Sequence, residues 1–400
     1  VSDPHRIDIR TKRLDIQKKY MSASQAVRIQ YSSKNASVSN AWKKWQGEAL
    51  GIKRMKAVEE NLEYEKRFRE WAQGGEFEGV LDKLDSLYAL FEPYDFKRFY
   101  YTETAATVEL PQFAVRAAGL LGDPEGKKSA AASFFKDWYL PIDKESFIAV
   151  MKAFDDNVTD KPAFFTDAID RYGSIEAAAD DIFGNSLFTD MESVCALTPA
   201  DSVKVSQDPA YLFAMEFRDW YSKEIFPRYE ELNSEINLCY RDYMRGRMAM
   251  GQEDDFFPDA NLTLRVAYGE VKGYSPRDGV YYSPYSTVSG VIEKDNPEIF
   301  DYNIPQKLRG LFSSGDAPDT PVCFLATNHT TGGNSGSPVI NADGNLVGIN
   351  FDRVWEGTMS DIVYDPDYCR NISIDIRYLL FIVDKIGGAG NIIGEMTFAD

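Results

Sequence analysis

The 400-residue sequence predicts an α+β fold, in which a helical domain of residues 1–255 precedes a β domain of residues 256–400. Two observations carry this prediction. Up to about residue 250, apolar side chains recur at three- and four-residue steps, as on one face of a helix. After about residue 258, they alternate with polar side chains or gather in short runs rich in β-branched and aromatic residues. The change of period marks the boundary between the two domains.

In the helical domain, the clearest pattern belongs to one long helix near the boundary. Its apolar residues follow a 3-4-3-4 spacing, which predicts packing along a single seam: Tyr229, Leu232, Ile236, Cys239 and Tyr243. Proline and glycine in "FEPYD", "LLGDPEGKK" and "YLPID" predict helix breaks. The first residues already have helical character, without an initiator Met or a signal peptide, which favours a processed or truncated chain.

The β domain opens with "NLTLRVAYGEVKGY", whose alternation predicts a strand. Further strands are expected in "GVYYSPYSTVSGVIEK", "PVCFLATN" and "SPVINADGNLVGIN", where the "NADGN" turn indicates a hairpin. The segment "NISIDIRYLLFIVDKIGG" begins as a strand and ends as a helix. We therefore expect an antiparallel sandwich or barrel, and we favour a half-barrel that follows a helical domain in the sequence.

Composition excludes several functions. The formal net charge of −19 makes nucleic acid and anionic membranes poor partners. The sequence contains no run of eighteen apolar residues, so it predicts no membrane-spanning helix. The four cysteines are too scattered for a disulfide scaffold or a zinc cluster, and the acidic runs "EDDFFPDA" and "YDPDY" lack the pattern of a calcium loop. We expect no metal and no other cofactor.

The stretch "TTGGNSGSPV" places Ser335 among glycines directly before an apolar strand. A serine nucleophile needs a base to take its proton and backbone N–H groups that stabilise the oxyanion. Flanking glycines let the chain turn those groups inward without a Cβ clash. We therefore predict Ser335 as the nucleophile, with the Gly333 and Ser335 N–H groups as the oxyanion hole. The alternative is an ordinary glycine–serine turn before a hairpin.

The longer stretch "TGGNSGSPVINADGNLVGINFD" resembles the nucleophile loop of chymotrypsin-type serine peptidases, and more closely that of the S46 family of bacterial dipeptidyl-peptidases. "AVRIQYSSKNASVSNAWKKWQG" and "RYLLFIVDKIGGAGNIIGEM" extend the resemblance over nearly the whole chain. It implies an exopeptidase that releases dipeptides from peptides with a free N-terminus. It also implies a chymotrypsin-like double β-barrel with a helical cap, a periplasmic or cell-surface location, and a homodimer.

The sequence has only two histidines that could serve as the base, His5 and His329. In chymotrypsin-type order, the base and its aspartate precede the serine. His329 lies too near Ser335 to come from an opposite barrel, and His5 lies in a charged helical stretch. We therefore expect the catalytic His and Asp in an upstream barrel before Val1, so that this chain is the C-terminal portion of the enzyme and inactive alone. The alternative is a non-catalytic peptide-binding module.

Downstream of the serine, "NFDRVWEG" contains Arg353. A guanidinium in the S1 pocket can bind a substrate carboxylate through two parallel hydrogen bonds. The resemblance to the S46 family also implies that Arg353 binds a P1 carboxylate, since family members with arginine at this position cleave after Asp or Glu. The alternative is a surface ion pair between Arg353 and Asp352 or Glu356.

The substrate's α-ammonium needs a carboxylate and further polar groups. By resemblance, Asp352 supplies the carboxylate and Phe351 lines the pocket beside it. Asn40, in "SVSNAWKKW", resembles the contribution of the helical domain to this site. Asn35 is an alternative for that role, and helix capping is an alternative explanation for Asn40.

Overall fold

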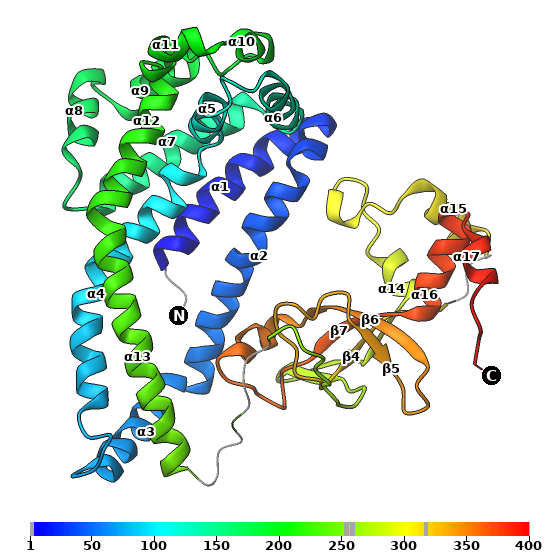
Figure 1. Ribbon diagram of the computed structural model, residues 1–400. Helices are drawn as coiled ribbons and strands as arrows, with labels where there is room; N and C mark the ends of the chain where they lie inside the picture. Colours follow the sequence, from blue (N-terminus) through cyan, green and yellow to red (C-terminus); the bar gives the residue numbers. More distant parts are fainter. Residues whose placement is uncertain (1–3, 252–255, 257–260, 316–318, 400) are drawn as a thin grey trace. The chain divides into compact units, whose positions relative to one another are not determined.

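The computed structural model describes residues 4–251, 256, 261–315 and 319–399 (Figure 1). The chain forms two compact units. The helical unit comprises residues 1–46 and 60–256, and the sheet unit comprises residues 47–59 and 257–400. Residues 47–59 therefore cluster with the sheet unit, although the sequence analysis placed them in the helical domain. Over the described residues, no helix is both long and apolar enough to cross a membrane.

Helices make up the first unit almost entirely, as its sequence pattern predicts. They are α1 (Pro4–Ala23), α2 (Gln25–Met55), α3 (Ala57–Ala72), α4 (Val80–Glu103), α5 (Glu109–Ala118), α6 (Pro124–Lys136), α7 (Leu140–Asn157), α8 (Ala163–Tyr172), α9 (Ile175–Asn185), α10 (Met191–Ala196), α11 (Ser202–Ser206), α12 (Pro209–Trp220) and α13 (Phe226–Met250). The last turns of α2 and the start of α3 belong to the sheet unit.

The predicted long helix is α13, and its seam is buried as expected. Leu232, Ile236 and Cys239 lie in a core cluster with Leu84 and Leu87 of α4. Figure 1 shows α13 running alongside α4. The long pairing buries one face of each helix, which is the main source of stability for helices in water.

Two of the three predicted helix breaks are confirmed. Asp123 caps α6 and Pro124 begins it, while α7 begins at Leu140 with a proline in its first turn. The break predicted at "FEPYD" is wrong, because Pro93 lies inside α4. A proline costs one backbone hydrogen bond within a helix, and the buried faces on both sides of Pro93 keep α4 continuous.

A buried carboxylate joins two helices of this unit. Asp143 of α7 accepts hydrogen bonds from the Glu109 and Leu110 N–H groups at 2.8 and 2.7 Å, and from the Trp138 indole N–H at 3.0 Å. Glu109 and Leu110 are the first residues of α5, whose N–H groups have no partner within their own helix. Asp143 therefore caps α5 from another helix.

The second unit is built on a five-stranded antiparallel sheet in the order β3-β4-β7-β6-β5, with a separate β1-β2 hairpin. The strands are β1 (Tyr274–Arg277), β2 (Val280–Tyr282), β3 (Tyr285–Thr287), β4 (Pro321–Ala326), β5 (Pro338–Ile340), β6 (Leu346–Arg353) and β7 (Asn371–Asp375), and the helices are α14 (Val288–Glu293), α15 (Gln306–Ser313), α16 (Ile376–Phe381) and α17 (Gly390–Gly394). A helical domain followed by an antiparallel β domain is thus confirmed.

Finer predictions for the sheet unit have different outcomes. The "NADGN" hairpin is confirmed, since it connects β5 and β6 with Gly344 at φ 83°. The final segment begins as β7 and continues as α16, also as predicted. Within the described residues the sheet is open, with β3 and β5 at its edges. The half-barrel of a chymotrypsin-like double barrel therefore stays a prediction.

The strand predicted from "NLTLRVAYGEVKGY" is wrong over most of its length. Residues 261–270 form no strand, Val271 makes an isolated bridge to Ala326, and β1 begins only at Tyr274. Alternation indicates a segment that can bury one face. In the structure, the apolar members of the pattern are exposed: Leu262, Leu264, Val266 and Tyr268.

The end of α2 packs against η5 (Trp355–Asp361), the 3₁₀ segment that follows β6. A Cβ atom on Gly47 would lie 1.8 Å from the Thr358 hydroxyl oxygen, so only glycine allows this approach. Arg54 donates a hydrogen bond to the Glu356 carbonyl oxygen at 3.1 Å and lies 4.0 Å from the ring centroid of Tyr368. These contacts support the segment that supplies the partners of Arg353.

Candidate active site

The Ser335 loop is anchored on strand β6. Gly336 N–H donates to the Asn350 carbonyl oxygen at 2.8 Å, and Asn350 N–H donates to the Ser337 carbonyl oxygen at 2.9 Å. Gly333 and Gly336 have φ values of 101° and 87°, which side chains with a Cβ rarely adopt. The glycines thus allow the tight path that leaves Ser335 exposed between them.

The backbone N–H groups of this loop fall into two sets. Those of Thr331, Asn334, Gly336 and Ser337 all donate hydrogen bonds within the loop or to β6. For the Gly332, Gly333 and Ser335 N–H groups, the described part of the chain provides no acceptor. Free donors next to a serine hydroxyl are what an oxyanion hole requires. The two groups predicted for that role are therefore available for it.

The side chains of Asn350 and Asn371 connect the loop to the central strands of the sheet through hydrogen bonds. The buried Asn350 donates from Nδ2 to the Asn334 carbonyl oxygen at 3.1 Å, and accepts from Asn371 Nδ2 at 3.0 Å. This connection was not predicted from the sequence. The available signal was an asparagine at the end of the apolar run "NLVGIN", where an inward polar side chain needs a partner.

Strand β6 is irregular beside the serine. Asn350 pairs with Ser373 and Asp352 pairs with Ile372, so Phe351 is an extra residue in the β6–β7 ladder. Such bulges redirect side chains and are common next to active sites. The Ser335 hydroxyl lies 3.5 Å from the Phe351 carbonyl oxygen, and the Phe351 side chain is 46% exposed. The bulge thus lies where the nucleophile loop meets the strand of Arg353.

Neither histidine contacts Ser335. His329 Nε2 lies 3.0 Å from the Ser360 carbonyl oxygen, and its ring packs against Tyr364. His5, in the helical unit, lies with Nδ1 2.8 Å from the Tyr100 hydroxyl. The contact with the Phe351 carbonyl is the one hydrogen bond of the Ser335 hydroxyl to the residues described. Both histidines thus have other partners.

Arg353 is held by two residues of η5. Its Nη1 donates to the Ser360 hydroxyl at 2.6 Å, and Nη1 and Nη2 each lie 3.1 Å from one oxygen of the Asp361 carboxylate. The alternative pairing with Asp352 or Glu356 is wrong. Asp352 accepts from the backbone N–H of Arg353, and Glu356 accepts from the Tyr274 hydroxyl at 2.6 Å.

The pairing with Asp361 leaves part of the guanidinium free. Asp361 occupies the end formed by Nη1 and Nη2. The side formed by Nε and the second hydrogen of Nη2 has no acceptor within the described ranges, although it can bind another carboxylate through two hydrogen bonds. The cavity that Arg353 lines is only about 10 Å³, and the Arg353 side chain is 19% exposed, so a carboxylate would have to reach the guanidinium through its exposed part.

Asn40 lies in the helical unit, exposed in the middle of α2. Since α2 begins at Gln25, the capping explanation for Asn40 is wrong. The alternative residue, Asn35, donates from Nδ2 to Gln17 Oε1 at 3.0 Å. A role of Asn40 in substrate binding stays a prediction. In the part of the chain that the structure describes, no cluster of three or more His, Cys, Asp or Glu is placed to hold a metal ion.

An antiparallel sheet that presents a glycine–serine loop, joined to a helical unit, has clear counterparts among peptidases. The family model for peptidase S46 matches residues 1–398. The chain therefore belongs to the S46 peptidases.

Individual relatives agree with this family. An Asp/Glu-specific dipeptidyl-peptidase of Flavobacterium psychrophilum is 39% identical over 99% of this chain, and a protein of the same description from Capnocytophaga gingivalis is 37% identical over 99%. The crystal structure of Porphyromonas endodontalis DPP11 in complex with the dipeptide Arg-Glu superimposes with a TM-score of 0.88 at 31% identity. That superposition covers 99% of this chain and 60% of the DPP11 chain.

The chain spans 59% of the length of each of the two curated relatives. The family match takes in essentially all of this chain. Membership in the S46 family is confirmed, whereas these matches do not show the predicted restriction of the chain to the C-terminal portion of such an enzyme.

Proposed function

We propose that this chain carries the nucleophile and the P1-binding group of a serine dipeptidyl-peptidase that removes N-terminal dipeptides ending in Asp or Glu. The observation that carries the proposal is the side of the Arg353 guanidinium that has no acceptor among the described residues, on the strand that anchors the Ser335 loop. The relatives named Asp/Glu-specific dipeptidyl-peptidases support the same substrate class.

In this mechanism the Ser335 hydroxyl attacks the scissile carbonyl carbon. The carbonyl oxygen becomes an oxyanion, which the Gly333 and Ser335 N–H groups stabilise. The attacking hydroxyl must lose its proton, and the partners of His5 and His329 make both poor candidates for the base. The base and its aspartate therefore come from outside these 400 residues, and the chain alone has little or no turnover.

The P1 carboxylate binds the free side of Arg353. Ser360 and Asp361 fix the guanidinium plane, so the remaining fork is presented in one orientation. An oriented fork binds a carboxylate through two charge-assisted hydrogen bonds, whereas an apolar P1 side chain would leave those donors unpaired. The preference for Asp and Glu follows from this difference. Asp352 binds the α-ammonium of the substrate, and Phe351 lines the pocket.

A second candidate function, a non-catalytic peptide-binding module, is favoured by one observation. The Ser335 hydroxyl contacts no base among the described residues. This candidate predicts that an Asp- or Glu-terminated dipeptide binds, while no form of the gene product hydrolyses a substrate.

The test uses the full-length product of the gene and a Leu-Asp chromogenic substrate. Ser335→Ala should lower kcat by about 10⁴-fold or more, because the nucleophile is lost. Ser337→Ala, which removes another hydroxyl of the same loop, is the matched control and should retain most activity. Turnover of Ser335→Ala close to that of the unmodified enzyme would refute the nucleophile. Absence of turnover in the unmodified full-length product, with binding retained, would favour the binding module.

A further inference from the structure

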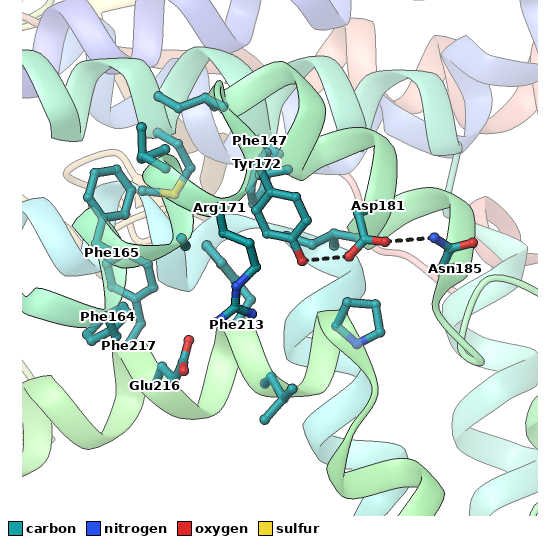
Figure 2. A pocket seen from close by; sticks show the side chains of 18 of the residues that line it. Phe147, Phe164, Phe165, Arg171, Tyr172, Asp181, Asn185, Phe213, Glu216 and Phe217 are labelled. Atoms are coloured by element: carbon teal, nitrogen blue, oxygen red, sulfur yellow. Dashed lines mark hydrogen bonds between the residues drawn. The ribbon is translucent and has the colours of Figure 1, made fainter.

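The helical unit contains a pocket of about 370 Å³ between α7, α8, α9 and α12 (Figure 2). Its volume lies within the range of small-molecule sites. Its inner wall is aromatic and aliphatic, with Phe147, Phe165 and Phe217 among its buried residues. A ligand there would bury an apolar group against these rings.

The polar residues of the pocket gather on another part of its wall. Tyr172 donates to the Asp181 carboxylate at 2.6 Å, and Asn185 donates to the same carboxylate at 2.7 Å. These three side chains therefore satisfy one another, as the dashed lines in Figure 2 indicate. Asp181 is consequently not the group that a ligand would pair with first.

Arg171 and Glu216 are the other two charged residues that line the pocket. Both line the pocket with exposed side chains, and the charged ends of the two lie near each other in Figure 2. The Arg171 side chain also interacts with Tyr172, where it opposes the rise in the Tyr172 pKa that burial causes. No ion pair within 4 Å joins Arg171 or Glu216 to another of the residues described. Although Glu216 is exposed as a residue, partial enclosure of its carboxyl raises its pKa, and the positive charge of Arg171 opposes that shift. One cation and one anion, neither of them in a close ion pair among the described residues, thus line the same pocket.

We propose that this pocket binds a free α-amino acid with a large apolar side chain. The α-carboxylate and α-ammonium leave the same carbon, so the two charges of the ligand lie at one end. The charged end of the ligand pairs with Arg171 and Glu216, and its side chain packs against the aromatic residues of the pocket. An apolar molecule without charges would leave both Arg171 and Glu216 without a partner in the ligand. An ion of one sign would be repelled by whichever of the two side chains carries the same charge.

The pocket lies within the helical unit, and the Ser335 loop lies within the sheet unit. The proposal is therefore independent of the peptidase function. A peptide-binding protein and an active peptidase would be equally able to carry it.

The test is calorimetric titration of the 400-residue chain with L-phenylalanine. We expect saturable binding with a Kd of about 1 mM or tighter. Glycine tests the need for the side chain, and N-acetyl-L-phenylalaninamide tests the need for the two charges; both should bind at least about tenfold more weakly. No binding of phenylalanine, or equal binding of the uncharged analogue, would overturn the proposal.

Variants locate the site. Arg171→Gln and Glu216→Gln should each weaken phenylalanine binding about tenfold, since each removes one charge partner. Arg116→Gln and Glu192→Gln, exposed charges of the same unit that do not line the pocket, are the controls and should leave the Kd unchanged. Because all four positions are on the surface, the fold should persist, which circular dichroism would check. Binding insensitive to both Arg171→Gln and Glu216→Gln would overturn the assignment.

Discussion

The two units use buried polar groups for different purposes. In the helical unit, Asp143 caps α5 from another helix and lies beside a large aromatic core. In the sheet unit, Asn350 and Asn371 lead from the middle of the sheet to the Ser335 loop. The first arrangement holds helices together, and the second holds an exposed hydroxyl in place. We therefore expect substitutions in the two units to affect different properties.

The largest loss of stability is expected for Asp143→Ala. Three buried N–H donors lose their acceptor, which should lower the free energy of unfolding by about 3 kcal/mol. Chemical denaturation followed by helical circular dichroism measures this change. Asp180→Ala is the control, because its ion pair with Lys144 is exposed and should contribute less than about 1 kcal/mol. Equal losses in the free energy of unfolding for the two substitutions would contradict the role of Asp143 as the cap of α5.

In the sheet unit, Asn350→Ala should cost about 2 kcal/mol of stability, because Asn371 and the Asn334 carbonyl lose a buried partner. Its effect on turnover in the full-length product should be larger than this loss explains, since the loop loses its anchor. Activity measured well below the unfolding temperature separates the two effects. A variant that is destabilised but fully active would contradict the role of Asn350 and Asn371 in holding the Ser335 loop in place.

A smaller effect is expected for Asp361→Asn. The change weakens the hold on the Arg353 guanidinium, so kcat/KM for a P1 Asp substrate should fall about tenfold in the full-length product, or about 1.4 kcal/mol. An apolar P1 substrate should be affected less. Asp367→Asn, an exposed carboxylate with no contact to Arg353, is the control. A rise in kcat/KM would mean that Asp361 competes with the substrate instead of orienting the arginine.

The two units also differ in how well the sequence predicted them. The α13 seam was predictable, because helical periodicity directly indicates which side chains are buried. The strand expected after residue 260 was wrong, because alternation does not reveal whether a neighbouring strand is present to pair with it.

The candidate site divides in the same way. The Ser335 loop could be found from sequence, since its glycines and serine are contiguous. Ser360 and Asp361 could not, because their contact with Arg353 depends on how η5 folds back onto β6. The bulge at Phe351 likewise arises from the register of two strands that are distant in sequence.

The central claim is that Arg353 selects an acidic P1 residue, and one ratio tests it most directly. This ratio is kcat/KM for a Leu-Asp substrate divided by kcat/KM for a Leu-Leu substrate, in the full-length product and in its Arg353→Gly variant. We predict that the ratio falls by about a hundredfold, because the substrate carboxylate loses two charge-assisted hydrogen bonds. A ratio that is the same in both proteins would contradict the claim.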